Sequence, residues 1–389
     1  MRHRNTVLYS VLNYLPWQAF DRLVSRCESD KYVRTLSTKT HFIALAYGQL
    51  AGASGLRETV TTLNSHDAQL YHLGGRSVAR STLSDANANR PSTIFQELFA
   101  TLMAQAHHSL RQELKLVVRL IDSTPLRLNQ LSKDWARFST DVCGAKVHVV
   151  YDPDANQPVY AAFSKANVND ITAAQVMPIE PGATYVFDLG YYDYAWWAKM
   201  HAAGCRIVTR LKTNTKLTLT LERLMPAGHA ILSDRIGYLP KRQASNRRNP
   251  FKAEVREVRV RIATGQTLRV LTNDLTSPAQ VIADLYKRRW AIELFFRWIK
   301  QTLAISKFIG TSENAVRSQV FVALTVFLLQ RLAHASQTAV PKLLDFIRLV
   351  RVHLMSRRNI RYLDGRPARQ EPGAGVPDLV ACGAAHGTG

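Results

Sequence analysis

Two aspartates each follow an apolar run that predicts a β-strand, a position from which a carboxylate can reach an active site. Asp122 closes the apolar run LVVRLID and Asp188 closes the run TYVFD, so each carboxylate follows a predicted strand. If the two strands are neighbours, both acids lie at one edge of a sheet, where like charges repel unless a cation lies between them. Carboxylates suit Mg²⁺, and two such ions stabilise both oxygens of a phosphodiester displacement. Each Asp alone is more typical of a turn after a strand, and the matching pair leaves both interpretations open.

A third acid, Glu293, lies in a predicted helix that mixes cations with core-forming side chains, YKRRWAIELFFRWIK (residues 286–300). One face of this helix, about 60° wide at helical spacing, carries Tyr286, Arg289, Glu293 and Lys300. The adjacent face is apolar and consists of Leu285, Ile292, Phe296, Ile299 and Leu303.

The cations of this helix outnumber its acids. Arg289 and Glu293 are spaced as an ordinary i, i+4 salt bridge, which is the structural alternative. That pairing leaves no acid in the segment for the remaining cations, which are Lys287, Arg288, Arg297 and Lys300. A cationic face beside a metal-binding acid would suit a DNA backbone, whose phosphates the cations would hold.

The spacing Tyr286-x2-Arg289-x3-Glu293-x6-Lys300 resembles the Tyr-Arg-Glu-Lys signature of DDE transposases of bacterial insertion sequences, in the Insertion Sequence 4 family. Asp122 in LIDSTPLRL and Asp188 in YVFDLGYYDY resemble the first two catalytic acids of that family. The resemblance implies an RNase H-like sheet flanked by helices. It also implies a helical N-terminal domain and a β-rich insertion before the last catalytic helix.

The same resemblance implies a site and its cofactors. Asp122, Asp188 and Glu293 would bind two Mg²⁺ ions, which Mn²⁺ could replace, so their carboxylates should converge. Tyr286, Arg289 and Lys300 would hold the terminal phosphates, with help from the nearby Arg297. Two neighbouring acids, Asp170 and Asp193, are taken as structural.

The activity that the resemblance implies is cut-and-paste transposition. An activated water nicks the DNA at the element's end, and the freed 3′-OH attacks the other strand or the target. The partners would be the terminal inverted repeats and target DNA, held by a homodimer on paired ends. Two alternatives stay open: an RNase H-like metal nuclease without strand transfer, and a DNA-binding protein that descends from a transposase and does not cut.

Charge agrees with a nucleic-acid partner. Lys and Arg total 51 against 29 for Asp and Glu, so the net charge is +22 and the isoelectric point about 10.1. A field of that sign attracts polyanions. No window of about 18 consecutive apolar residues occurs, and the four cysteines show no metal-binding spacing. We therefore expect a cytoplasmic bacterial protein that meets the nucleoid when it binds DNA, and no membrane.

The order of apolar patterns predicts the organisation of the chain. Residues 1–112 read as a helical DNA-binding domain, with a helix-turn-helix over residues 56–63 and 78–87. Its predicted outward side chains are Arg76, Arg80, Ser81, Thr82 and Asn87. Arg80 is the candidate for DNA contact in this domain.

The rest of the chain divides into three further parts. Residues 113–212 and 276–335 predict the catalytic mixed sheet, with a hairpin around DPDANQP and one long helix that begins at Ser277-Pro278. Residues 213–275 predict a β-rich insertion with the basic loop KRQASNRRNPFK. Residues 336–389 predict a basic C-terminal region that ends in a disordered tail.

Overall fold

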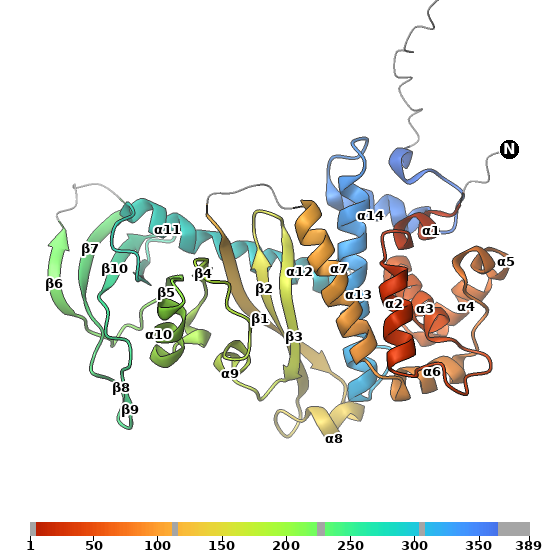
Figure 1. Ribbon diagram of the computed structural model, residues 1–389, viewed down its shortest axis with the longest axis horizontal. Coiled ribbons are helices and arrows are strands. Elements are labelled where there is room, and N and C mark those ends of the chain that lie inside the picture. Colours follow the sequence, from red (N-terminus) through yellow and green to blue (C-terminus); the bar gives the residue numbers. More distant parts are fainter. Residues whose placement is uncertain (1–4, 111–115, 224–229, 303–307, 365–389) are drawn as a thin grey trace, which may run out of the picture.

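The structure is a computed structural model that describes residues 5–110, 116–223, 230–302 and 308–364. A large sheet with its own helices forms one end of the molecule, and a group of helices forms the other (Figure 1). The predicted tail, residues 371–389, lies outside the described residues.

Within the described residues the main sheet has nine strands in the order β3-β2-β1-β4-β5-β11-β10-β7-β6. The strands are β1 (Val118–Leu128), β2 (Cys143–Asp152), β3 (Gln157–Lys165), β4 (Thr184–Val186), β5 (Arg206–Arg210), β6 (Thr218–Arg223), β7 (Ile231–Tyr238), β10 (Val255–Arg261) and β11 (Thr267–Thr272). β4 is parallel to both β1 and β5, and the other neighbours are antiparallel. The predicted mixed sheet is confirmed. A separate hairpin consists of β8 (Arg242–Ala244) and β9 (Arg247–Arg248).

Three details of the sheet differ from the sequence expectations. The strands of the predicted insertion continue the same sheet, because β11 pairs with β5. Asp122 does not end its strand: β1 runs on to Leu128 and stays paired with β2 throughout. β7 was not predicted, because the charged Asp234 and the small Gly237 interrupt its apolar pattern.

Helices precede the sheet, cover it and follow it. The N-terminal ones are α1 (Val7–Leu12), α2 (Trp17–Arg26), α3 (Thr38–Ala51), α4 (Leu56–Asn64), α5 (Asp67–Leu70), α6 (Arg80–Asn89) and α7 (Thr93–Leu110). Those that follow are α8 (Lys133–Ala136), α9 (Asp170–Ala174), α10 (Tyr194–Ala202), α11 (Ala279–Arg288), α12 (Trp290–Thr302), α13 (Glu313–Ala335) and α14 (Leu343–Val352). The 3-10 turns are η1 (Tyr71–Leu73), η2 (Gln130–Ser132), η3 (Leu189–Tyr191) and η4 (Ile360–Tyr362).

Two helix predictions need correction. Asn87 does not face outward: its side chain is buried and its Oδ1 lies 2.7 Å from Nε2 of His41. The predicted single helix is two helices, because α11 ends at Arg288 and α12 begins at Trp290. Arg289 joins them with a helical backbone, and its N–H donates to the carbonyl of Tyr286, one residue closer than in an α-helix.

The sheet is covered on both faces. Side chains of α9 and α10 pack with Ile121, Val150 and Tyr185 on one face. The other face presents Leu120 and Val149 to a core that α7, α12 and α13 share with the N-terminal helices. Alternate residues of a strand point to opposite faces, which explains why neighbours such as Leu120 and Ile121 belong to different cores.

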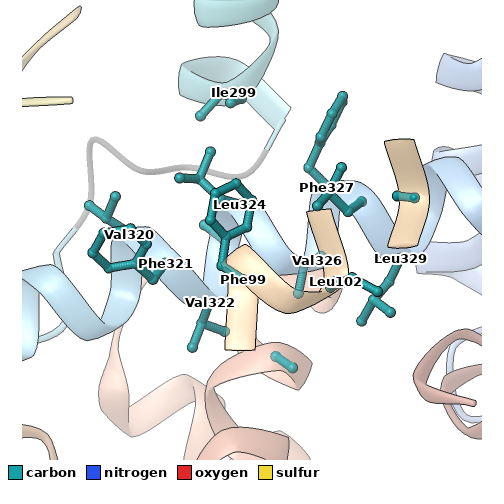
Figure 2. Close-up of a cluster of buried hydrophobic side chains, with 14 of the residues drawn as sticks. Phe99, Leu102, Ile299, Val320, Phe321, Val322, Leu324, Val326, Phe327 and Leu329 are labelled. Atoms are coloured by element: carbon teal, nitrogen blue, oxygen red, sulfur yellow. The ribbon is translucent and has the colours of Figure 1, made fainter. Parts of the chain in front are cut away.

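α13 is the central helix of the larger core. Figure 2 shows Phe99 and Leu102 of α7 beside its side chains, with Ile299 of α12 on another side. By length and composition α13 is the described helix that could cross a membrane, but 83% of its apolar window is buried inside the protein. Its apolar surface is therefore accounted for by the protein core.

Candidate active site

Asp122 and Asp188 lie at matching positions of two parallel strands. Leu120 of β1 pairs with Val186 of β4, and each aspartate is the second residue after that pair. Asp188 leaves β4 as the N-cap of η3, where its Oδ1 accepts a hydrogen bond of 2.8 Å from the backbone N–H of Gly190. The chain therefore delivers two carboxylates side by side.

Glu293 joins this pair through Arg289. The Arg289 guanidinium lies 2.5 Å from Glu293 Oε1 through Nη2 and 3.5 Å from Asp122 Oδ2 through Nη1. Its position at the junction of α11 and α12 places the guanidinium between the helix acid and the strand acid. The ordinary salt bridge that the spacing allowed is present, and it reaches into the site rather than into solvent.

The acids influence one another electrostatically. Burial raises the pKa of Asp122 to about 6, and the charges of Asp188 and Glu293 add to the rise. The backbone N–H of Ser123 and the guanidinium of Arg289 act in the opposite direction. One arginine therefore offsets only part of the negative charge that this edge of the sheet collects.

Tyr286 lies against the same cluster. The side chain is almost fully buried, and the Arg289 guanidinium lies 5.8 Å from the centre of its ring. Burial raises the pKa of the Tyr286 hydroxyl, while the charges of Arg289 and Arg210 oppose the rise. Arg210, at the end of β5, was not singled out from the sequence, because it belongs to no recognisable motif.

A second group of polar side chains lies beside the two aspartates, and no sequence pattern predicted it. Asp170 accepts a hydrogen bond of 2.8 Å from Ser123 Oγ and lies 3.1 Å from Lys146 Nζ. The buried Tyr191 lies within electrostatic reach of Asp122, Asp170 and Asp188, and its own pKa is raised well above the ordinary value, first by burial. Asp170 was interpreted as structural from the sequence. In the structure it contacts Ser123, the residue after Asp122.

Two family models match parts of this chain. The family model named Transposase DDE domain matches residues 113–329, which is more than half of the chain. The chain belongs to the DDE transposase family. It therefore cleaves DNA and transfers strands, the reaction of that family, and the resemblance stated from the sequence is confirmed. A second family model, a domain of unknown function (DUF4372), matches residues 3–76.

Curated relatives of this transposase carry the same description. The "Putative transposase y4zB" of Sinorhizobium fredii (strain NBRC 101917 / NGR234) is 40% identical over 289 residues, which are 73% of this chain and 80% of that protein. The "Probable transposase for insertion sequence element IS5377" of Geobacillus stearothermophilus is 30% identical over 261 residues, 64% of this chain and 66% of that protein.

The solved structure of a piggyBac transposase synaptic complex with hairpin DNA covers 90% of this transposase, and 79% of that chain is matched. The two are 10% identical, with a TM-score of 0.42. This structural similarity is too low to assign a shared feature to the two proteins.

The remaining candidate residues of the transposase lie in three different settings. Lys300 is half-buried on α12, where it lines a small cavity with Thr124 of β1, and burial lowers its pKa. Arg297 is exposed, with its guanidinium 5.6 Å from the centre of the Trp290 ring. Arg80 is exposed at the start of α6, among the N-terminal helices and away from the acids (Figure 1).

The donors of this site are carboxylates, which divalent metal ions prefer, but their arrangement in the described residues does not form a metal site. In the described ranges, no three His, Cys, Asp or Glu side chains are placed so that they could hold one ion. Arg289 lies between Asp122 and Glu293, where it already supplies positive charge. Burial first, and then the charges of Asp188 and Glu293, raise the pKa of Asp122, and a bound cation would oppose both effects. The DDE transposase family uses divalent metal ions.

Proposed function

We propose that this transposase excises and inserts its own insertion sequence, with Asp122, Asp188 and Glu293 as the catalytic acids. The observation that carries the proposal is the matching register of the two aspartates on parallel strands, with Glu293 tied to Asp122 by Arg289. Ser123 and Gly190 would position the two aspartates, since their backbone N–H groups donate to Asp122 Oδ1 and Asp188 Oδ1, each at 2.8 Å. Asp170 would act through Ser123, whose Oγ donates to it.

The three acids would hold two Mg²⁺ ions, for which Mn²⁺ could substitute. When bound, such ions activate a water and stabilise the attacking and leaving oxygens of a phosphodiester. The protein's own part is to hold the three carboxylates near one edge of the sheet and to keep Asp122 desolvated. Arg289 would offset part of the charge of Asp122 and Glu293 before cations bind.

We assign the terminal phosphates of the DNA to Tyr286, Arg289, Lys300 and Arg297. All four lie on α11, α12 or the junction between them, so one pair of helices would carry both the last acid and the phosphate contacts. Arg80, on the N-terminal helices, would contact the DNA farther from the cut. Cations at these places lower the energy of a bound polyanion without reading its sequence.

The strand order β3-β2-β1-β4-β5 supports an RNase H-like unit over residues 113–212 and 276–335, with residues 213–275 as its insertion. Residues 1–112 would form the DNA-binding domain, and residues 336–389 a basic C-terminal region. We further propose a homodimer that holds two inverted repeats and joins them to target DNA. We place the protein in the bacterial cytoplasm, on the nucleoid when bound to DNA.

A cleavage and joining assay tests the proposal. The substrate is a labelled duplex with the DNA that flanks this gene, incubated with Mg²⁺. The wild-type protein should nick the duplex and join the labelled 3′-OH end, whereas Glu293→Gln should bind the duplex with unchanged affinity and do neither.

Glu313→Gln is the matched control, because Glu313 forms the same kind of i, i+4 pair with Arg317 (2.7 Å) at the start of α13. It should cleave as the wild type does. Cleavage without any joined product would favour the nuclease, and a Glu293→Gln variant with full biological activity would favour a protein that only binds DNA.

A further inference from the structure

The β8–β9 hairpin lies outside the nine-stranded sheet and projects beyond it below α10 (Figure 1). Its segment, residues 241–252, contains five cations and no acid, in the sequence KRQASNRRNPFK. We call residues 241–249 the basic arm. The catalytic proposal made no use of it.

The base of the basic arm is fastened firmly to the protein. The buried Asn249 donates a 2.9 Å hydrogen bond from its side chain to the carbonyl of Pro240, and its Oδ1 accepts one of 2.8 Å from the N–H of Phe251. Phe251 is itself buried, with its ring centre 5.2 Å from that of His201 on α10. A two-stranded hairpin is marginally stable by itself, so these contacts explain how it persists outside the sheet.

Gln243 connects the basic arm to the segment that follows Asp188. Its side-chain oxygen accepts a 2.8 Å hydrogen bond from the backbone N–H of Tyr194, and its side-chain nitrogen donates one of 2.9 Å to the carbonyl of Tyr192. Tyr192 lies in the short stretch between β4 and α10 that also contains Asp188, and Tyr194 is the first residue of α10. The arm is thus held in a fixed position relative to one catalytic acid.

The cations of the basic arm have little counter-charge from the protein. Arg247 Nη1 lies 3.5 Å from Asp193 Oδ2, and 66% of the Arg247 side chain is exposed. Lys241 and Arg248 are exposed and form no salt bridge with any residue that the structure describes. Like charges on so short a hairpin repel one another, and a bound polyanion would remove that repulsion.

We propose that the basic arm binds the phosphates of duplex DNA beside the cut, and that Gln243 fixes the distance from this contact to Asp188. The inference rests on the proposed catalytic site and adds a positioning function to it. A two-stranded ribbon fits the major groove, which is about 12 Å wide, so the cations on its two strands can reach the phosphates on either side. The DNA is then gripped at one point and cut at a fixed offset from it.

The first test removes charge from the basic arm. Lys241→Gln with Arg248→Gln is compared with the wild type for binding to a fluorescent random-sequence duplex over a series of salt concentrations. Each lost phosphate contact makes the slope of log affinity against log salt shallower by about 0.9, so the double variant should lose about 2.

The matched control is Arg357→Gln with Arg358→Gln, which removes the same charge from two exposed residues after α14, at the other end of the molecule (Figure 1). Its slope should equal that of the wild type. An unchanged slope in the arm variant, or an equal loss in the control, would overturn the proposal.

The second test concerns Gln243. In Gln243→Ala the cut in the duplex that flanks the gene should spread over several neighbouring phosphates. A purely structural role would lower the overall rate and leave a single cut. A single cut at the wild-type position therefore overturns the positioning role of Gln243.

The failure of either proposal can be recognised separately. A wild-type protein that binds both duplexes but never cuts would refute the proposed function, and the salt slopes would still decide whether the basic arm contacts DNA. A wild-type protein that cuts and joins, beside an arm variant with unchanged binding, would refute the basic arm alone.

Discussion

Arg289 shows how much of the site depends on one side chain. Its guanidinium bridges a strand acid and a helix acid that would otherwise repel each other, and it also lies against the ring of Tyr286. A lysine would supply the charge but not the fork of donors that reaches two carboxylates at once. The ion pairs of Arg289 therefore preorganise the free site. A cation that binds there must share Asp122 and Glu293 with Arg289 or displace its guanidinium.

Gly190 gives a prediction at this scale. A Cβ at this position would lie 3.0 Å from Asp188 Oδ1 and 3.2 Å from Asp170 Oδ2, so Gly190→Ala must displace the carboxylate that we propose as catalytic. We expect cleavage to fall by about 100-fold, since misplacement of about 1 Å can cost that much. The measurement is the single-turnover rate of nicking.

The control for that prediction is Gly55→Ala. A Cβ at Gly55 would meet nothing within 4 Å, and its φ of −173° suits any residue. The nicking rate of this variant should equal that of the wild type. Equal rates in both variants would show that Asp188 tolerates displacement and is not held as we describe.

At the scale of single elements, the strands of the insertion are tied to the helix pair by a buried ion pair. Arg256 of β10 donates to both oxygens of Asp234 on β7 at 2.7 Å, and its Nη1 also donates to the carbonyl of Ser277, just before α11. Arg256 and Asp234 are almost fully buried. The sheet extension therefore helps to set where α11 begins.

Removing one partner of this pair should be far more harmful than removing its exposed neighbour. Asp234→Asn leaves the buried Arg256 without a counter-charge and should lower the free energy of unfolding by about 3 to 5 kcal/mol. The next residue, Arg235, pairs with Glu222 at the surface (2.7 Å), and Arg235→Gln should cost about 1 kcal/mol or less. Urea unfolding measures both, and equal losses would contradict the assigned role.

A second element-scale prediction concerns His41 of α3. Burial lowers its pKa to about 4, whereas an unfolded histidine titrates near 6.5. As pH falls below about 6.5, His41 becomes protonated in the unfolded chain but stays neutral in the folded protein. The stability that this residue contributes, about 3 kcal/mol at full effect, is therefore complete above pH 6.5 and lost toward pH 4.

Urea unfolding of His41→Gln at pH 7.5 and 4.5 tests this directly. The variant should lose less stability between the two pH values than the wild type does. The exposed His72 provides the control, because His72→Gln should keep the wild-type difference. An identical difference in all three proteins would mean that His41 does not resist protonation in the folded state.

The sequence predicted those parts of the structure that local patterns determine. The β2–β3 hairpin and α10 follow from apolar periodicity, and motif spacing singled out the acids on β1, just after β4 and on α12. Gly190, Tyr191 and Asp170 could not be predicted as neighbours of the acids, because their positions depend on how η3 and α9 pack against β1. The break at Arg289 was also missed, since YKRRW contains neither proline nor glycine to signal it.

At the scale of the whole molecule, the N-terminal helices and the sheet share one core. The contiguous set of buried side chains that includes Phe42 of α3 also includes Leu120 of β1, and α13 contacts α3, α6, α7 and α12. Helices that contact DNA through Arg80 would therefore stand in a fixed relation to the catalytic acids. If Arg80 and the three acids act as proposed, the shared core would keep a constant distance between the DNA that is held and the DNA that is cut.

This shared core predicts a shared loss of stability. Leu324 lies in the middle of α13 and is 1% exposed, and Leu324→Ala should lower the free energy of unfolding by about 2 to 5 kcal/mol. Hydrogen exchange read by mass spectrometry should then show reduced protection in α3 and in β1 together. Leu344→Ala on α14, where the side chain is 48% exposed, should change neither. Loss of protection confined to α1–α6 would mean that the N-terminal helices unfold by themselves, and the fixed distance between DNA contact and catalytic acids would not hold.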